Sequence, residues 1–191
     1  MKVVKVLGET ESEGFLKKEG FPVVENALAK TQKEAEKIAM KLGWPIAMKI
    51  TSEKPIHKSK QKGVITGIDN KKELQKAFNK LSKKSKTLLL QKQIHGKEIF
   101  IGLKHDRVFG YVLLLGQGGI SVEEYKSILK IFPIKNIDTL LKEAQLEDQI
   151  IAEIIAKIIA LTKKFSIKEL DINPLILGEK AQIVDARIIF D

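Results

Sequence analysis

The 191-residue sequence contains no cysteine, which excludes disulfide bonds and thiolate metal sites and is typical of a cytosolic protein. It also contains no run of about 18 apolar residues, so no membrane-spanning helix is expected. The apolar stretch near the N-terminus is too short for a secretory signal. These absences predict a cytoplasmic protein. With 43% hydrophobic residues, the chain can bury the core of one or two small domains.

Arginine and aromatic residues are scarce. The chain has two arginines against 32 lysines, two tyrosines and one tryptophan. Sequence-specific readers of DNA rely on bidentate arginine, and RNA readers stack bases on aromatic rings or arginine. The composition therefore disfavours a nucleic acid partner, although a basic RNA-binding domain remains a rival hypothesis.

The net charge of +10 is unevenly distributed. Residues 51–100 hold 13 lysines and four acids, a net charge of +9. Such a field attracts polyanions, either nucleic acid or a phosphorylated small molecule. Many of these lysines are equally well explained as ordinary solvated surface.

The first half of the chain has the pattern of a small α+β unit. A helix is expected over residues 31–44, with Thr31 and Glu34 forming a capping box and Gly43 ending the helix. A strand over 45–50, a basic loop that leads into a second strand, and an amphipathic helix over 70–84 follow. We place a boundary near Lys86, where helix gives way to strand.

The second half, residues 87–191, is expected to open with three antiparallel strands separated by His95-Gly96 and by a turn at residues 105–107. A short helix is expected over 121–130, capped by Ser121 and Glu124, and a longer core-packed helix over 146–165. The predicted domains are therefore residues 1–86 and 87–191.

The stretch LDINPLILGEKAQIVDAR, residues 170–187, is expected to form a hairpin. If the turn is Gly178-Glu179-Lys180, Leu177 faces Ala181 and Asn173 lies opposite Asp185. Amide and carboxylate oxygens of this kind suit Mg²⁺, which also takes water and substrate phosphates. The same residues also permit a simpler interpretation, a turn at Asn-Pro and a surface ion pair of Asp185 with Arg187.

Four stretches occur in the order of a known family pattern: GWPIAMKITSEKPIHKSKQKGV, LLLQKQIHGKEIFIGLKHDRVFG, GQGGISVE and ELDINPL with VDARI. Together they resemble the ATP-grasp subunit of NDP-forming acyl-CoA synthetases, which include ADP-forming acetate–CoA ligase. The resemblance covers nearly the whole chain. It implies an α+β ATP-grasp fold, in which two α+β subdomains hold the nucleotide between them.

The resemblance also implies the site. It makes Asn173 and Asp185 the Mg²⁺ ligands of bound ATP or ADP, and Asp171 a third ligand or an orienting partner of the catalytic histidine. The implied nucleotide-binding residues are Lys49, Gln91, Lys92, Gln93, Ile94, Glu98, Gly118 and Gly119. A lysine ammonium over the phosphates gives sound electrostatic stabilisation.

His57, in the HKS stretch, resembles a phosphoryl carrier between a phosphohistidine on a partner subunit and ADP. Imidazole suits this role because it is a nucleophile when neutral near pH 7. The implied activity is acyl-CoA + ADP + phosphate ⇌ acid + CoA + ATP, with an α-type CoA-binding subunit as partner in a hetero-oligomer. In the loop, Lys60 and Lys62 replace an acid and a glycine of the family pattern. This departure supports an alternative, a diverged non-catalytic module that binds nucleotide or a partner.

Overall fold

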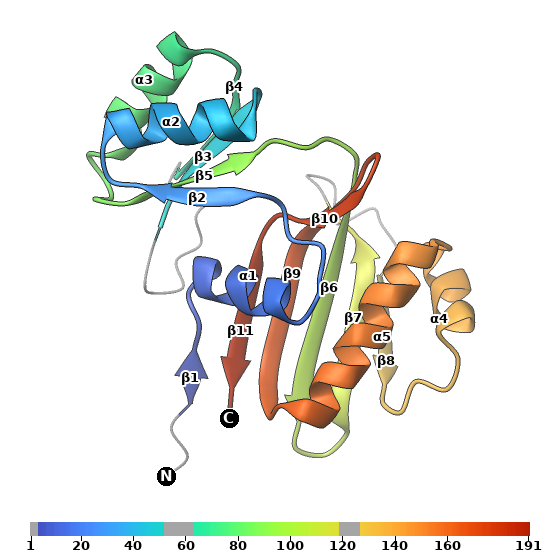
Figure 1. Ribbon diagram of the computed structural model, residues 1–191. Coiled ribbons are helices and arrows are strands. Elements are labelled where there is room, and N and C mark those ends of the chain that lie inside the picture. Colours follow the sequence, from blue (N-terminus) through green and yellow to red (C-terminus); the bar gives the residue numbers. More distant parts are fainter. Residues whose placement is uncertain (1–3, 52–62, 119–126) are drawn as a thin grey trace. The chain divides into compact units, whose positions relative to one another are not determined.

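The chain folds into two units, shown in the computed structural model of Figure 1, which describes residues 4–51, 63–118 and 127–191. Unit 1 combines residues 1–23 with residues 95–191, and unit 2 is the continuous segment 24–94. Unit 2 is thus inserted into unit 1 between its first helix and its main sheet. None of the helices in the described ranges combines the length and apolar character that a membrane crossing requires.

Unit 1 is built on an antiparallel sheet of seven strands. Six of them have the order β1-β11-β9-β6-β7-β8, and the seventh, β10, pairs with β9. The strands are β1 (Lys5–Val6), β6 (Lys97–Asp106), β7 (Gly110–Gln117), β8 (Ser127–Ile131), β9 (Ile167–Leu177), β10 (Ala181–Ile183) and β11 (Ala186–Phe190). Chain segments from both ends therefore share one sheet, since β1 pairs with β11.

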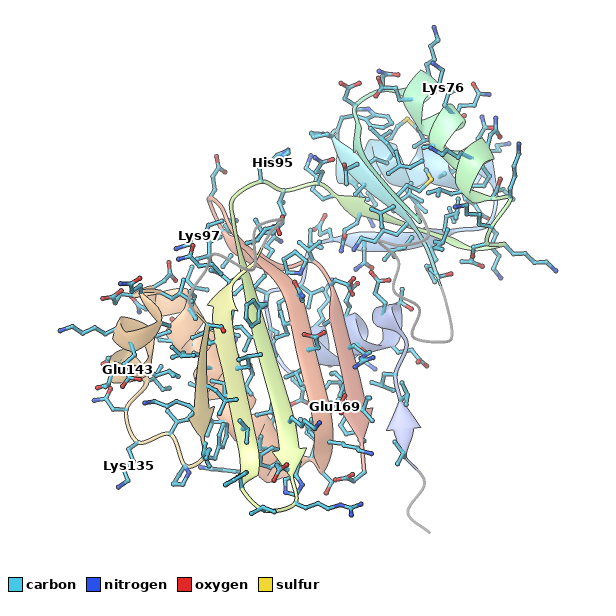
Figure 2. All side chains as sticks on the ribbon, turned by 180° about the vertical axis from the view of Figure 1, so that it is seen from behind. Lys76, His95, Lys97, Lys135, Glu143 and Glu169 are labelled. Carbon is cyan, nitrogen blue, oxygen red and sulfur yellow. The ribbon has the colours of Figure 1, made fainter. Side chains whose placement is uncertain are left out.

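Three helices supply the core of unit 1: α1 (Glu9–Lys18), α4 (Ile137–Ala144) and α5 (Gln149–Lys164). Their apolar residues pack with alternate strand residues, such as Ile101, Leu170 and Ile188. Because side chains alternate between faces of a strand, this pattern buries one face of the sheet. Figure 2 shows the sheet from its other side, where Glu169 on β9 projects from the sheet.

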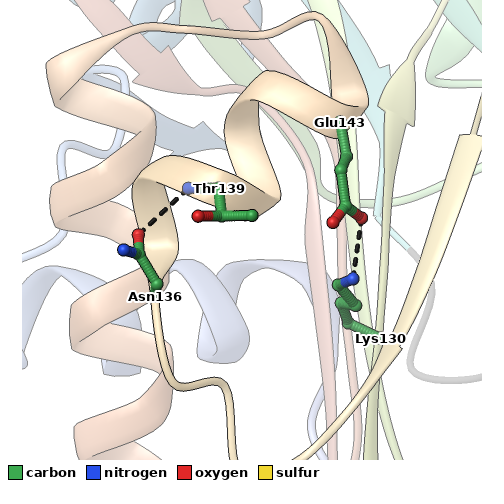
Figure 3. A network of polar contacts seen from close by, with 4 residues as sticks. All are labelled: Lys130, Asn136, Thr139 and Glu143. Atoms are coloured by element: carbon green, nitrogen blue, oxygen red, sulfur yellow. Dashed lines mark hydrogen bonds and ion pairs between the residues drawn. The ribbon is translucent and has the colours of Figure 1, made fainter.

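Figure 3 shows two polar contacts of α4, one that caps the helix and one that links it to β8 at the edge of the sheet. Asn136 caps the helix, because its side-chain oxygen accepts a hydrogen bond of 3.0 Å from the Thr139 amide. Glu143 forms an ion pair of 2.7 Å with Lys130 on β8. The predicted helix over 146–165 is confirmed as α5, which begins after its N-cap Asp148.

Unit 2 contains an antiparallel four-stranded sheet of order β2-β5-β3-β4, with two helices packed on it. Its elements are β2 (Asn26–Ala29), α2 (Gln32–Leu42), β3 (Ile46–Ile50), β4 (Val64–Ile68), α3 (Lys71–Leu81) and β5 (Leu88–Lys92). The predicted capping box of α2 is confirmed: Thr31 accepts from the Glu34 amide, and the Glu34 carboxylate accepts from the Thr31 amide.

The units differ from the predicted domains in two segments. Residues 87–94 belong to unit 2, because β5 is a central strand that pairs with both β2 and β3. Residues 1–23 belong to unit 1, because α1 packs on β11. The predicted boundary near Lys86 would separate β5 from its own sheet. Local sequence marks where a strand starts, whereas long-range pairing decides which sheet it joins.

The helix predicted over 121–130 is wrong where the structure describes it. Residues 127–131 form strand β8, which pairs with β7 through Leu115↔Ile128 and Leu113↔Lys130. Exposure alternates along β8 as expected for an edge strand with one covered face. The helical interpretation failed because a short apolar stretch is ambiguous and the neighbouring strand decides its conformation. Ser121 and Glu124, the predicted cap, lie outside the described residues.

Candidate nucleotide and metal site

The C-terminal hairpin has the predicted three-residue turn. Leu177 pairs with Ala181, and the same register resumes where Ile172 pairs with Ala186. Between these pairs, the Asn173 amide donates a hydrogen bond of 3.0 Å to the Asp185 carbonyl. The predicted opposition of Asn173 and Asp185 is therefore confirmed at the level of the backbone.

The side chain of Asp185 lies in an acidic cluster with Glu9 and Glu13. One carboxylate oxygen from each of the three residues lies within 4.8 Å of the others. Glu13 is only 2% exposed, and Glu9 and Asp185 are half-buried. Ser12 ties α1 to the sheet beside this cluster, because its hydroxyl accepts a hydrogen bond of 3.1 Å from the Ile188 amide.

The sequence interpretation missed Glu9 and Glu13. The available signal was their spacing, since residues four apart share a face of a helix. That spacing cannot reveal Asp185 as their neighbour, because it lies more than 170 residues away and only the packing of α1 on β11 brings it close.

Asp171 lies in the middle of β9, between Gly102 on β6 and Arg187 on β11. Desolvation by the surrounding strands raises the pKa of its carboxyl, although the residue as a whole is exposed. The Arg187 charge lowers this pKa, and the charges of Asp185 and Glu169 raise it. Arg187 also forms an ion pair of 3.4 Å with Glu169. The net effect on Asp171, one of the predicted site residues, is a raised pKa with desolvation as its main cause.

Glu98 and Gly118 lie together where β6 begins and β7 ends. The Gly118 amide donates a hydrogen bond of 2.7 Å to the Glu98 carbonyl, and a Cβ at Gly118 would lie 3.3 Å from the Glu98 Cβ. Glycine therefore allows the close approach of these two segments. Glu98 also pairs with Ile176 on β9, so the same sheet carries both this pair and the hairpin.

Lys49 and Gln91 occupy neighbouring strands of unit 2. Ala47 pairs with Gln91, and Lys49 pairs with Leu89. Lys49 is 5% exposed, and Gln91 is fully buried. Lys49 is the lysine that the family resemblance implies for phosphate binding, and it lies on a buried strand of unit 2.

Lys92 and Gln93, two of the predicted nucleotide-binding residues, form several hydrogen bonds inside unit 2. The Lys92 ammonium donates to the carbonyls of Gly43 and Trp44, at 3.0 and 2.8 Å. The Gln93 side chain accepts a hydrogen bond from the Gly67 amide. The amides of Lys92 and Gln93 donate to the carbonyls at positions 25 and 45. These contacts orient Lys92 toward the C-terminal end of α2.

The predicted site residues therefore gather in two groups, one in each unit. Unit 1 holds Glu98, Gly118, Asp171, Asn173 and Asp185 on one sheet, and unit 2 holds Lys49, Gln91, Lys92, Gln93 and Ile94 on two adjacent strands and the segment after them. His57 and Gly119 lie outside the described residues.

A comparison of the sequence with protein families matches an ATP-grasp domain over residues 2–190. This chain belongs to the ATP-grasp family. The β subunit of ADP-forming acetate–CoA ligase II from Pyrococcus furiosus is 34% identical to this ATP-grasp chain, over 95% of the chain and 90% of that subunit. The predicted fold and family resemblance are both confirmed.

A second relative is a longer protein. The ADP-forming 4-hydroxybutyrate–CoA ligase of Nitrosopumilus maritimus is 34% identical over 94% of this ATP-grasp chain, but the match spans only 30% of the relative's length. The ATP-grasp chain thus matches 90% of the length of one relative and 30% of the length of another.

Solved structures agree with this assignment. The ATP-grasp chain matches acetyl-coenzyme A synthetase 1 of Candidatus Korarchaeum cryptofilum in complex with coenzyme A and Ca-AMPCP. The TM-score is 0.83 and the identity 28%, over 98% of this chain and 94% of that one. Another complex of the same enzyme contains Mg-AMPPCP, with its phosphohistidine segment pointing towards the nucleotide-binding site, and matches with a TM-score of 0.75 at 28% identity, over 98% of this chain and 93% of that one.

Proposed function

We propose that this chain is the nucleotide-binding part of an ADP-forming acyl-CoA synthetase, which converts acyl-CoA, ADP and phosphate into a carboxylic acid, CoA and ATP. The observation that carries the proposal is the register of the β9–β10–β11 hairpin, which sets Asn173 against Asp185. The names of the relatives support the reaction class.

The residues of unit 1 fit a divalent cation. Asn173 offers an amide oxygen, Asp185 a carboxylate, and Glu9 and Glu13 place further carboxylate oxygens next to Asp185. Hard cations such as Mg²⁺ prefer oxygen ligands of this kind. When bound, Mg²⁺ would neutralise charge on the phosphates of ADP or ATP. We assign Asn173 and Asp185 as its ligands in this chain.

The other site residues bind and orient the nucleotide in this proposal. Lys49 binds the phosphates, because a buried ammonium attracts them strongly and requires little reorganisation. Glu98, Gly118 and Gly119 are assigned to nucleotide binding in this proposal. The segment from Gln91 to Ile94 contacts the base, through groups other than the Lys92 and Gln93 amides, which already donate within unit 2.

His57 carries the phosphoryl group in this proposal. A neutral imidazole nitrogen of His57 forms a P–N bond as the P–N bond of the partner's phosphohistidine breaks. The β-phosphate oxygen of ADP then attacks the same phosphorus, which forms ATP and releases neutral His57. The role that the family resemblance implies for Asp171 is that of a third metal ligand or of an orienting partner of the catalytic histidine.

The partner in this proposal is an α-type CoA-binding chain, and the assembly is a hetero-oligomer. Support comes from the relative that is named a β subunit and from the longer relative, of which this chain matches 30%.

The metal and nucleotide assignment is tested by calorimetric titration with Mg·ADP. Wild type should bind saturably, and chelation of Mg²⁺ should weaken binding. Asp185→Ala should weaken it about tenfold or more, whereas Asp138→Ala, an exposed acid on α4, should not. Equal affinity of wild type and Asp185→Ala would reject the metal assignment.

The catalytic assignment is tested by adding the CoA-binding chain and measuring ATP formation from acyl-CoA, ADP and phosphate. His57→Ala should bind Mg·ADP normally and form no ATP. If wild type binds Mg·ADP and forms no ATP with its partner, the chain is the non-catalytic binding module that its lysine-rich loop suggests.

A further inference from the structure

The β6–β7 turn is a rigid loop with two apolar residues at its tip. Asp106 pairs with Gly110, so residues 107–109 form the loop. One carboxylate oxygen of Asp106 accepts hydrogen bonds from the amides of Val108 and Phe109, at 2.8 and 3.0 Å. Gly110, the first residue of β7, has φ of +72°, a left-handed conformation that glycine adopts without a steric penalty from a Cβ. The backbone of the tip is therefore held in one conformation.

The side chains at this tip face solvent. Val108 is 83% exposed and Phe109 is 59% exposed. Turns usually carry glycine, asparagine, aspartate or serine, and the fold does not need a valine and a phenylalanine here. Single exposed apolar residues are ordinary, but an adjacent pair on a preorganised loop has the properties of a binding anchor, because little entropy is lost when it is buried.

The same end of the sheet carries both described ends of the chain, as Figure 1 shows at the start of β1 and the end of β11. Lys5 pairs with Phe190, and the Asp191 amide donates to the Ser166 carbonyl. Tyr111, next to the turn, bonds to the backbone of Ile167, and the charge of Asp191 contributes to raising its pKa after the larger effect of burial. We call the surface formed by the turn and these ends the chain-end face.

The chain-end face and Glu98, one of the proposed nucleotide-binding residues, lie at opposite ends of β6. Glu98 lies at the start of β6 and Asp106 lies at its end. A strand of ten residues spans about 30 Å. A protein docked on the chain-end face would therefore leave Glu98 and Gly118 accessible.

We propose that Val108 and Phe109 are the anchor with which this chain docks on its CoA-binding partner. The inference rests on the proposed function. The occupant follows from the longer relative, whose additional polypeptide is continuous with the part that this chain matches and so must join it at an end. Both described ends of this fold lie on the chain-end face. We therefore expect the CoA-binding partner to bind next to this face.

The test compares Phe109→Asp with Met40→Asp, a control on α2 in unit 2 whose wild-type residue is 71% exposed. The probe is the CoA-binding chain from the same source that restores ATP formation when mixed with wild type. Its affinity for each variant is measured by calorimetry. Phe109→Asp should weaken association about 30-fold or more, as for a central anchor residue, and Phe109→Leu should keep most of it. Met40→Asp should match wild type.

Each outcome decides the question. Weak association of Phe109→Asp with unchanged Mg·ADP affinity supports the proposal and shows that the variant is folded. Association equal to wild type overturns the docking anchor and leaves the proposed function intact. A wild-type chain that binds no CoA-binding chain overturns both the anchor and the proposed partner. A change in the chain's own sedimentation on Phe109→Asp, without loss of partner binding, would assign the tip to self-association instead.

Discussion

At the scale of single residues, the backbone and the side chain of Lys92 have different roles. Its backbone lies in the segment expected to contact the nucleotide base, yet its ammonium donates to two carbonyls where α2 ends. Those carbonyls lack helical partners, and a lysine near a helix C-terminus also interacts favourably with the helix dipole. The side chain therefore has a structural role, which no local pattern indicated.

Lys92→Met should reduce the free energy of unfolding by about 1.5–3 kcal/mol, because hydrogen bonds from a charged donor are lost. Lys41→Met, which replaces an exposed lysine in the last turn of α2, should change this free energy little. Urea unfolding of both variants measures the difference. Unchanged stability together with weaker Mg·ADP binding would instead assign the Lys92 side chain to the nucleotide.

Asp106 gives a prediction for pH. The amides of Phe109 and Val108 hold the pKa of its carboxyl below the usual value, and the desolvation that opposes them is a smaller effect. A lowered folded-state pKa means that the unfolded chain binds the proton more readily. The contribution to stability is therefore complete above the unfolded pKa and is lost as pH falls through the folded pKa.

The urea midpoint of wild type relative to Asp106→Asn should therefore be higher at pH 7 and should converge toward the variant in strong acid. Carboxyl NMR titration of wild type should report a pKa below that of a model peptide. A constant difference between the two proteins from pH 7 to pH 2.5 would contradict the assigned cause.

At the scale of elements, the C-terminal hairpin depends on a close approach to the segment that follows unit 2. A Cβ at Gly178 would collide with the His95 carbonyl, and a Cβ at Gly96 would collide with the Leu177 carbonyl. These two glycines hold the β9–β10 turn against the start of β6. The position of the hairpin, and with it Asn173, follows partly from this contact.

Gly178→Ala should destabilise the protein by about 1–3 kcal/mol, because backbone atoms cannot yield as a flexible side chain could. Gly14→Ala is the matched control. Nothing lies within 4 Å of a Cβ there, and alanine in the middle of α1 should stabilise by about 0.5–1 kcal/mol. Urea unfolding of both variants measures the expected loss of stability for Gly178→Ala and the expected gain for Gly14→Ala. A neutral Gly178→Ala would mean that the turn can move without loss.

At the scale of the whole molecule, the segment that interrupts unit 1, which is unit 2, also carries the excess positive charge. Residues 24–94 hold 17 lysines and six acids, a net charge of +11, whereas the remainder of the chain is close to neutral. The inserted unit therefore carries the basic field, together with Lys49. Its first and last strands are neighbours, since Asn26 pairs with Gln91. Such an insertion enters and leaves at one place.

A fragment of residues 24–94 should therefore fold by itself, because it contains a complete sheet and its own core. A fragment that ends at Lys86 should not fold, because it lacks β5, which lies between β2 and β3. Far-UV circular dichroism and cooperative urea unfolding of the two fragments distinguish them. Folding of the shorter fragment would restore the boundary predicted from sequence.

The sequence alone was sufficient for features that depend on neighbours along the chain. Thr31 and Glu34 are three residues apart and cap α2 as predicted, and the turn Gly178-Glu179-Lys180 sets the register that pairs Asn173 with Asp185. Turn length and side-chain spacing determine such features before any distant partner is present. They also determined the family, since its motifs are local.

Only the tertiary structure decided which distant segments meet. β5 belongs to unit 2 because β2 and β3 pair with its two edges. Ser127–Ile131 is a strand because it pairs with the free edge of β7. Glu9 and Glu13 reached Asp185 because α1 packs on β11. Apolar burial and backbone hydrogen bonding drive such contacts without regard to sequence distance, so periodicity in one segment cannot name its partner in another.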